Sequence, residues 1–401
     1  VTDALDRTTW YQYSLMGSLT HTWGAQYPVR YEYDDLNRMT HMHTYQRKGI
    51  WDTPSWPLLL DENESDVTQW DYHAPSGLLE YKTDAKGKQI HYTYGDGNRL
   101  ASRTWARTPN SMALTTTYGY TPTGKLASID YSDTTPDFAY TYKRFGSPHT
   151  ITDALGTRTF EYNNNLQPDS VDIPNHPLVS WPHDTMGRPA GVELGTTPDY
   201  AVTYGYDTKG RFNTVTWDVL NDAGGHIQDN ATYSYTPNSH LLGSLNLNSG
   251  TAISYTYDPL RDLKIQVQNT YNAASIISQY DYTHDAIGRR QTMTFTGLAF
   301  PEPSAVIPDD PGVSVTPSAK VYTPNELNQY DQIEQDSQVT TFIHDDDGNL
   351  IDDGTSLYTW NAENRLIGIE PKVPVQDDQK LAFMYDYAGR RVKKTVSVYD
   401  T

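Results

Sequence analysis

Four side chains that can bind an anion or move a proton lie close together in the segment "THMHTYQRKGIW" (residues 40–51). If this segment is a β-strand, the alternation of side chains places His41, His43, Tyr45 and Arg47 on one face. Such a face suits an acidic sugar, because Arg47 would neutralise a uronate carboxylate while His43 or Tyr45 exchanges the proton that β-elimination requires. The segment is therefore a candidate catalytic site for a polysaccharide lyase.

Three nearby residues would extend this site to substrate binding: Lys48 as a second cation, and Trp51 and Trp56 as rings that stack on a pyranose. The alternative interpretation is structural, with histidine replacing tyrosine as a strand residue and Arg47 and Lys48 protecting a strand edge. Histidines take such positions elsewhere, at His183, His284 and His344. We favour the structural interpretation, which makes the chain a non-enzymatic protein, and retain the lyase as an alternative.

Other patterns that carry chemistry are weaker. The segments "DENESD" (61–66) and "HDDDGN" (344–349) bring carboxylates together, but neither keeps the D-x-[DN]-x-[DN]-G spacing of a calcium loop. A carboxylate pair for glycoside hydrolysis cannot be chosen among 50 acidic residues, because such a pair is defined by its separation in space. The sequence has no Gly-rich phosphate loop, G-x-S-x-G or H-E-x-x-H motif. We expect neither a metal nor a cofactor.

The composition favours β-structure. Hydrophobic residues make up 36% of the 401 residues, and 32 residues are tyrosines, whereas an average protein is about 45–50% apolar. Tyrosine and threonine favour pleated, half-buried surfaces. The net charge of −20 repels phosphates and anionic membrane surfaces, so we expect no nucleic-acid partner. The absence of cysteine removes disulfides and zinc–thiolate sites and is compatible with a secreted protein.

No stretch approaches the ~20 apolar residues that span a membrane, so we expect no membrane-spanning segment. Val1 begins directly in repeat-like sequence, and the last residues, "VSVYDT", resemble the opening of another repeat. We therefore expect both ends to be boundaries within a larger parent chain.

One short phrase returns along the chain, as "YEYDDLNRMT" (31–40), "YGYDTKGRF" (204–212), "DYTHDAIGRR" (281–290) and "MYDYAGRR" (384–391). We call the aromatic or histidine residue before the turn the anchor of each repeat. The anchors are Tyr13, Tyr33, Tyr72, Tyr94, Tyr120, Tyr142, Tyr162, His183, Tyr206, Tyr235, Tyr257, His284, Tyr322, His344, Trp360 and Tyr385. Most neighbouring anchors are 20 to 29 residues apart, which is typical of a tandem repeat.

Within a repeat, alternating residues run into a turn, which predicts a β-hairpin. We expect the turn aspartates to accept hydrogen bonds from turn amides; they are Asp34, Asp207, Asp258, Asp285 and Asp386. We expect positive φ at Gly97-Asn98, Asn325, Gly348-Asn349 and Gly389. The fold class is all-β, and residues 1–401 form a single continuous array of tandem hairpins, with loop insertions near 51–66 and 300–313.

The pattern [Y/H/W]-[D/N]-x-x-[G/N]-[R/N/K]-[L/M/F/R] resembles the YD repeat of the Rhs family, which is shared with C components of bacterial Tc toxin complexes, wall-associated bacterial proteins and animal teneurins. The resemblance covers almost the entire chain. It implies a β-strip that spirals into a shell or open barrel, often around a toxin segment. The Arg- and Tyr-rich, self-cleaving end of the Rhs core has no match here, so no toxin domain is inferred.

These observations favour a structural YD-repeat scaffold of a large secreted or surface bacterial protein, which forms a shell or a glycan-contacting surface. Two alternatives remain, a polysaccharide lyase on the same scaffold and the wall of a toxin-encapsulating cage. The expected partners are an extracellular glycan or an encapsulated polypeptide.

Overall fold

A computed structural model describes residues 1–2, 8–24, 27–45, 53–57, 65–196, 200–220, 224–272, 275–297, 320–335 and 337–400. These residues form 33 β-strands and two single-turn 3-10 helices, and no α-helix occurs among them. The described part of the chain also holds no helix long and apolar enough to cross a membrane. The predicted all-β fold class is therefore confirmed.

Strands β1 to β24 belong to one 24-stranded sheet. Their bounds are β1 Thr9–Tyr13, β2 Leu19–Gly24, β3 Val29–Tyr33, β4 Met39–Thr44, β5 Asp66–Tyr72, β6 Leu79–Thr83, β7 Gln89–Tyr94, β8 Leu100–Thr104, β9 Thr115–Tyr120, β10 Leu126–Tyr131, β11 Phe138–Tyr142, β12 Pro148–Asp153, β13 Gly156–Tyr162, β14 Pro168–Asp172, β15 Val179–Ser180, β16 Gly191–Leu194, β17 Tyr200–Tyr206, β18 Phe212–Leu220, β19 His226–Tyr235, β20 Leu242–Leu247, β21 Thr251–Tyr257, β22 Lys264–Tyr271, β23 Ser275–His284 and β24 Arg290–Thr296. The helices are η2 (Asp96–Asn98) and η3 (Pro109–Ser111).

Two smaller sheets follow. The three-stranded sheet consists of β25 (Lys320–Pro324), β26 (Tyr330–Gln335) and β27 (Gln338–Thr341). The six-stranded sheet consists of β28 Ile343–His344, β29 Leu350–Asp352, β30 Ser356–Trp360, β31 Leu366–Pro371, β32 Gln379–Tyr385 and β33 Arg391–Val398. We call β28 to β33 with their turns the carboxyl-terminal strip.

The chain divides into two compact units. The first contains Val1–Gly146, Ile151–Leu155 and Thr316–Thr401, and the second contains Ser147–Thr150 and Gly156–Val315. The single continuous array stays a prediction. Of the two expected insertions, residues 51–52, 58–64 and 300–313 lie outside the described residues, and 53–57 and 65–66 lie within them.

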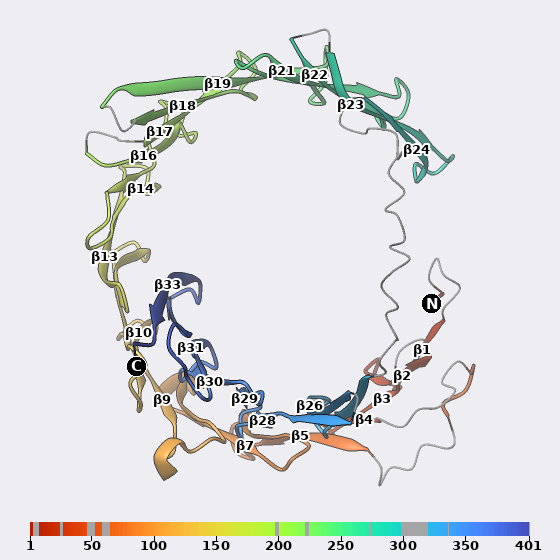
Figure 1. The fold of residues 1–401 in the computed structure, drawn as a ribbon, viewed down its shortest axis with the longest axis vertical. Helices are drawn as coiled ribbons and strands as arrows, with labels where there is room; N and C mark the ends of the chain where they lie inside the picture. Colours follow the sequence, from red (N-terminus) through yellow and green to blue (C-terminus); the bar gives the residue numbers. More distant parts are fainter. Residues whose placement is uncertain are drawn as a thin grey trace. The chain divides into compact units, whose positions relative to one another are not determined.

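Within a sheet, strands that follow one another in the sequence pair antiparallel, as the ribbon shows within each unit (Figure 1). In β17 and β18, for example, pairing runs without interruption from Tyr200 opposite Val219 to Gly205 opposite Thr214. The register then shifts before Tyr206 pairs with Phe212, next to the turn. The same register shift occurs in the hairpins whose first strands end at the anchors Tyr33, Tyr72, Tyr94, Tyr162, Tyr257 and Tyr385. The prediction of tandem hairpins is therefore confirmed.

The repeated aspartate closes each turn. The Asn37 amide donates to the Asp34 carbonyl at 2.9 Å, and Asn37 has a φ of 62°, which together indicate a type I turn followed by a bulge residue. The Asp34 carboxylate accepts hydrogen bonds from the amides of Leu36 and Arg38 at 3.0 and 2.9 Å. The predicted turn role is confirmed for Asp34, Asp207, Asp258, Asp285 and Asp386.

The expected positive φ is confirmed at Gly97, Asn98, Gly348 and Gly389, and wrong at Asn325 and Asn349, neither of which lies in that region. Asn325 instead takes the aspartate position, and its side-chain oxygen accepts from the amides of Leu327 and Gln329 at 3.0 Å each. An asparagine can serve either place in this turn, because its side chain caps amides and its backbone tolerates a left-handed conformation.

The anchor aromatics join each repeat to the one before it. The Tyr206 hydroxyl donates to the Pro189 carbonyl at 2.7 Å, and Pro189 opens the return strand of the preceding repeat. Nine anchor tyrosines make this bond: Tyr33, Tyr72, Tyr120, Tyr142, Tyr162, Tyr206, Tyr235, Tyr257 and Tyr385. The Trp360 indole makes the equivalent bond to the Leu350 carbonyl at 2.7 Å. The acceptor is in every case the residue after the last turn position.

We call the boundary between two consecutive repeats a junction. The cation at the last turn position also stabilises it. Arg38 pairs with Asp34 at 2.7 Å through Nε, lies 4.4 Å from the centre of the next anchor ring, Tyr72, and donates to the Gly77 carbonyl of the next turn at 2.9 Å. Arg211 repeats the arrangement, 4.2 Å from the Tyr235 ring. A cation over an aromatic face is worth about 0.5–1 kcal/mol at exposed sites, so each turn is fixed to the next.

The register across these junctions is constant. The third residue after the last turn position pairs with the third residue before the next anchor, as in His41–Gln69, Ser102–Thr117 and Thr214–Thr232. Among the described residues, Leu114, Tyr131, Phe138 and Ala362 form a small buried apolar cluster in the first unit, which we call the small core. Repeat-to-repeat contacts therefore hold most of the sheet together.

Candidate functional site

The structure brings His41 and His43 together with two residues of the neighbouring strand. In the β3–β4 hairpin, Arg30 lies opposite His43 and Glu32 lies opposite His41. The two imidazole rings have their centres 6.1 Å apart, and each has a nitrogen close to the Glu32 carboxylate, 3.3 Å for His41 and 3.4 Å for His43. Arg30 forms an ion pair with the same carboxylate. We call these four residues the histidine cluster.

The cluster continues onto β2. His21 pairs with Arg30 across the β2–β3 register, and burial lowers the pKa of His21, with a further lowering from the Arg30 guanidinium. His43 also contacts the Ser65 hydroxyl through Nδ1 at 3.0 Å. Glu32 thus contacts Arg30, His41 and His43 through one carboxylate.

Residues 53–57, within the first expected insertion, pack against β2 and Tyr45. The Trp56 ring lies 4.5 Å from His21, 5.6 Å from Trp23 and 6.1 Å from Tyr45, measured between ring centres. The Trp23 indole donates to the Thr53 carbonyl at 2.9 Å. Trp56 therefore packs in an aromatic cluster of the protein itself.

The proposed catalytic groups differ in accessibility. His43 and Tyr45 are buried, with 8% and 5% of their surface exposed, whereas a third of the His41 side chain is exposed. Arg47, Lys48 and Trp51 lie outside the described residues. The arrangement of His41, His43 and Glu32 can hold and pass a proton, but His43 and Tyr45 are buried, and Trp56 packs against Tyr45.

Arg30, Glu32 and His21 were not predicted from the sequence as neighbours of His41 and His43. A signal for them exists, because the turn at residues 34–37 sets the hairpin register and therefore predicts which β3 residue lies opposite each histidine. The position of His21 is harder to predict. His21 lies on a third strand, β2, and the register of β2 against β3 depends on the separate connection between these two strands.

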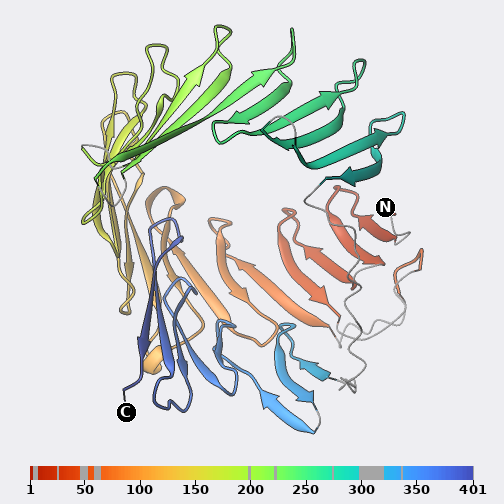
Figure 2. The same ribbon diagram turned by 45° about the horizontal axis from the view of Figure 1, so that its top comes forward.

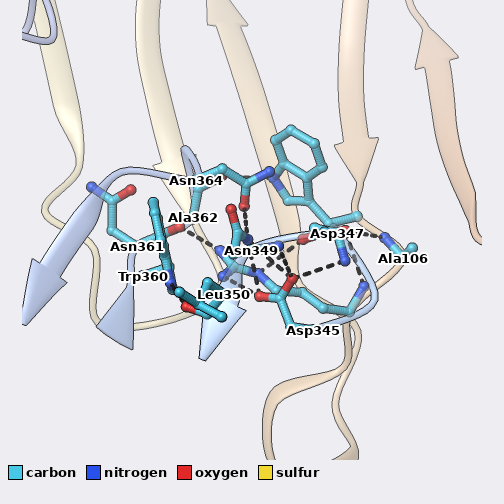
Figure 3. A network of polar contacts seen from close by, with 12 residues as sticks. Ala106, Asp345, Asp347, Asn349, Leu350, Trp360, Asn361, Ala362 and Asn364 are labelled. Carbon is cyan, nitrogen blue, oxygen red and sulfur yellow. Dashed lines mark hydrogen bonds and ion pairs between the residues drawn. The ribbon is translucent and has the colours of Figure 1, made fainter. Parts of the chain in front are cut away.

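A second network of polar contacts lies where the carboxyl-terminal strip meets the segment between β8 and β9 (Figure 2). Arg107, with 8% of its surface exposed, pairs with Asp345 at 3.2 Å and Asp347 at 2.9 Å and donates to the Asn361 carbonyl. Asp347 also accepts from the amides of Ala106 and Arg107 at 2.9 and 3.2 Å (Figure 3). Burial raises the pKa of Asp347, while hydrogen bonds and the charge from Arg107 oppose that rise.

Further contacts extend this network on both sides. Lys88 pairs with Asp346 at 2.7 Å, and Arg103 pairs with Glu363 at 2.9 Å. The Trp105 indole donates to the Ala362 carbonyl at 2.7 Å. The three carboxylates of the "HDDDGN" segment thus face cationic side chains in this structure. Residues 61–64 of "DENESD" lie outside the described residues.

The network borders the small core. The Ala362 amide donates to the Thr135 hydroxyl at 2.9 Å, and the Tyr387 amide donates to the Asp153 carboxylate at 3.0 Å. Burial raises the pKa of Tyr140, packed against the core, to about 12. We call this set of contacts, from Lys88 to Tyr387, the docking interface. Nothing in the local sequence pattern pointed to it.

The comparisons with known proteins show limited similarity. No family model matches the chain. Over 131 residues, or 33% of this chain, it is 30% identical to "tRNA nuclease WapA" of Bacillus subtilis (strain 168). It is also 30% identical over 131 residues to "tRNA3(Ser)-specific nuclease WapA" of Bacillus spizizenii. The matching residues amount to 4% of the length of each of these curated relatives.

Two solved structures can be superimposed on 97% of the chain. The crystal structure of TcdB2-TccC3 gives a TM-score of 0.43 at 12% identity and 26% of that chain. The Tc holotoxin pore of Photorhabdus luminescens gives a TM-score of 0.38 at 13% identity and 23% of that chain. The sequence similarity to WapA and the repeated aromatic–Asp turn are consistent with the resemblance to YD-repeat proteins.

Proposed function

We propose that this chain is a YD-repeat scaffold that builds part of the wall of a toxin-type shell. The observation that carries the proposal is the junction between repeats, in which the anchor hydroxyl and the turn cation bind the neighbouring repeat. Such a sheet extends by adding hairpins and needs only nearest-neighbour contacts. It gives a large continuous surface, which suits a wall.

The toxin-related part of the proposal rests on sequence similarity to the WapA proteins and on the repeated turn. We propose a secreted or bacterial cell-surface location within a larger parent chain, with an encapsulated polypeptide as the partner. The names of the WapA proteins describe tRNA nucleases, but the matching residues are a small part of them. A net charge of −20 disfavours contact with tRNA phosphates, so we assign a scaffold role to the matching segment.

A glycan-contacting surface is the second candidate. It is supported by tyrosine rings exposed near the amino terminus, 45% for Tyr11, 59% for Tyr13 and 57% for Tyr27, because such rings present an apolar face with a polar tip. The lyase proposal through His41, His43, Tyr45 and Arg47, with Lys48, Trp51 and Trp56 binding substrate, needs in addition that the buried His43 and Tyr45 become accessible.

A protease-protection experiment tests the wall. A flexible peptide with several trypsin sites is fused after residue 401, and its cleavage rate is compared with that of the same peptide fused to an unrelated monomeric protein. A wall predicts slower cleavage on this chain. Equal rates would contradict enclosure of a polypeptide.

Incubation with a panel of acidic polysaccharides tests the other two candidates. Binding measured by calorimetry, without an increase in the ultraviolet absorbance of unsaturated uronates, would support the glycan surface. An increase in absorbance would support the lyase.

A further inference from the structure

The three histidine anchors, His183, His284 and His344, each have a buried Nδ1 atom without a hydrogen-bond partner in the described structure, and His344 lies in the first unit. At the junction that precedes the carboxyl-terminal strip, the anchor is His344, and its Nδ1 atom is buried without a hydrogen-bond partner in the described structure. The anchor hydroxyl of other repeats reaches the residue after the last turn position. That residue is Tyr330 here, because the preceding turn ends at Gln329. An imidazole ends short of where a phenol places its hydroxyl, so the bond to Tyr330 is not made.

The register at this junction is otherwise that of the other repeats. Gln332 pairs with Thr341, three residues after Gln329 and three before His344. Gln329 also donates to the Gly348 carbonyl of the next turn at 2.6 Å. This junction therefore differs from those of the bonded anchors in the missing hydrogen bond of its anchor side chain, His344.

The pairing of strands is also interrupted here. Strand β27 pairs with β26 on one side, whereas β28 pairs with β29 on the other, and Phe342 between them belongs to neither ladder. The Phe342 amide retains one bond to the Asp331 carbonyl at 2.9 Å. In the 24-stranded sheet, by contrast, Ala231 and Thr232 of β19 pair with both neighbouring strands. The strand that leads to His344 is therefore interrupted at Phe342, whereas β19 runs without a break.

Charged groups from three elements face the His344 ring: Lys86 from the turn between β6 and β7, Asp331 from β26, and Asp345 from the following turn. Lys88 and Asp346 form an ion pair nearby. Burial lowers the pKa of His344, Lys86 lowers it further, and Asp331 and Asp345 oppose this change.

We propose that His344 makes the junction between β26 and β28 sensitive to pH, so that protonation of its imidazole loosens the attachment of the carboxyl-terminal strip to the three-stranded sheet. The neutral ring fits a site that gives Nδ1 no partner, whereas the imidazolium must bury a second N–H donor there. The pKa shift predicts the same direction. Because the pKa of His344 is lowered in the folded state, its contribution to stability is complete above the unfolded pKa of about 6.5 and decreases as the pH drops below that value. This inference does not depend on the shell proposal.

The test is amide hydrogen exchange of the full chain, with protection factors corrected for intrinsic rates, at pH 7.5 and 5.5. We expect protection of residues 330–335 and 338–344 to decrease at pH 5.5 in the natural chain. The junction at Trp360, whose indole keeps its bond to Leu350, is the internal control and should change less.

Two variants separate protonation from packing. His344→Phe removes the titrating group and should abolish the pH-dependent part of the change. His344→Tyr should also abolish it and, by adding the hydroxyl bond to Tyr330, raise protection about fivefold. Unchanged protection between the two pH values in the natural chain would overturn the proposal, and so would an undiminished pH response in His344→Phe. The first outcome needs no variant, so the proposal stays testable if a variant fails to fold.

Discussion

Replacing Arg107 with alanine gives the strongest expected effect of a single substitution at the docking interface. Arg107 is the buried cation between Asp345 and Asp347, and the Asp347 side chain has 1% of its surface exposed. Removing one partner of a buried ion pair leaves an uncompensated charge and costs about 3–5 kcal/mol. We therefore expect Arg107→Ala to lower the free energy of unfolding of the first unit by about this amount.

Denaturant unfolding and hydrogen exchange measure this effect. The exchange pattern should change most in the carboxyl-terminal strip, because its turn at residues 345–348 loses its cationic partner. Arg289→Ala is the matched control: Arg289 also pairs with an aspartate, Asp285, but its side chain is 78% exposed, so we expect a loss of about 0–1 kcal/mol.

The protonation state of Asp347 provides an independent check on this reasoning. The folded pKa of Asp347 is raised, so its contribution to stability is present below the unfolded pKa and is lost as pH rises through the folded value. Without Arg107 the buried carboxylate is less favourable still, and the deficit of Arg107→Ala should shrink as the pH falls toward 4. A loss below about 1 kcal/mol at pH 7, or a deficit that grows on acidification, would refute the docking role of this ion pair.

Three further outcomes follow from the geometry. Tyr206→Phe should cost about 0.5–1.5 kcal/mol in thermal or denaturant unfolding, because it removes only the hydroxyl bond to Pro189; no change would show that this bond adds nothing. Gly210→Ala should cost about 1–2 kcal/mol, since Gly210 has a φ of 79°, whereas an unaffected melting temperature would mean that the turn relaxes. Hydrogen bonds from the Arg38 side chain and backbone lower the pKa of Asp34, so its stabilising effect should persist above the unfolded pKa and disappear as pH falls through the folded one; NMR titration of Asp34 near its unfolded value would contradict this.

The repeated hairpin could be predicted from the sequence because its determinants are local. A turn aspartate, a residue with positive φ and an alternating strand all lie within about ten residues, so Asp34 and Gly348 were assigned correctly. Asn325 shows where such reasoning fails: asparagine suits two positions of the same turn, and the choice depends on register rather than on residue type.

The docking interface could not be predicted in this way. The Arg107 guanidinium and the Asp347 carboxylate are 240 positions apart in the chain, and each sits in a segment that reads as an ordinary polar turn. The candidate lyase site could be predicted in part. Alternation placed His41 and His43 together, but Trp56 packs against the neighbouring His21 and Tyr45, and its position depends on an insertion without a periodic pattern.

The central claim is that each repeat is held by its immediate neighbour, and a double-mutant cycle between Arg188 and Tyr206 tests it most directly. The Arg188 guanidinium lies 4.1 Å from the centre of the Tyr206 ring in the next repeat. We predict a coupling free energy of about 0.5–1 kcal/mol between Arg188→Ala and Tyr206→Leu. The same cycle between Arg188 and Tyr235, one repeat further along, should give none. Zero coupling in the first cycle, or equal coupling in both, would contradict the claim.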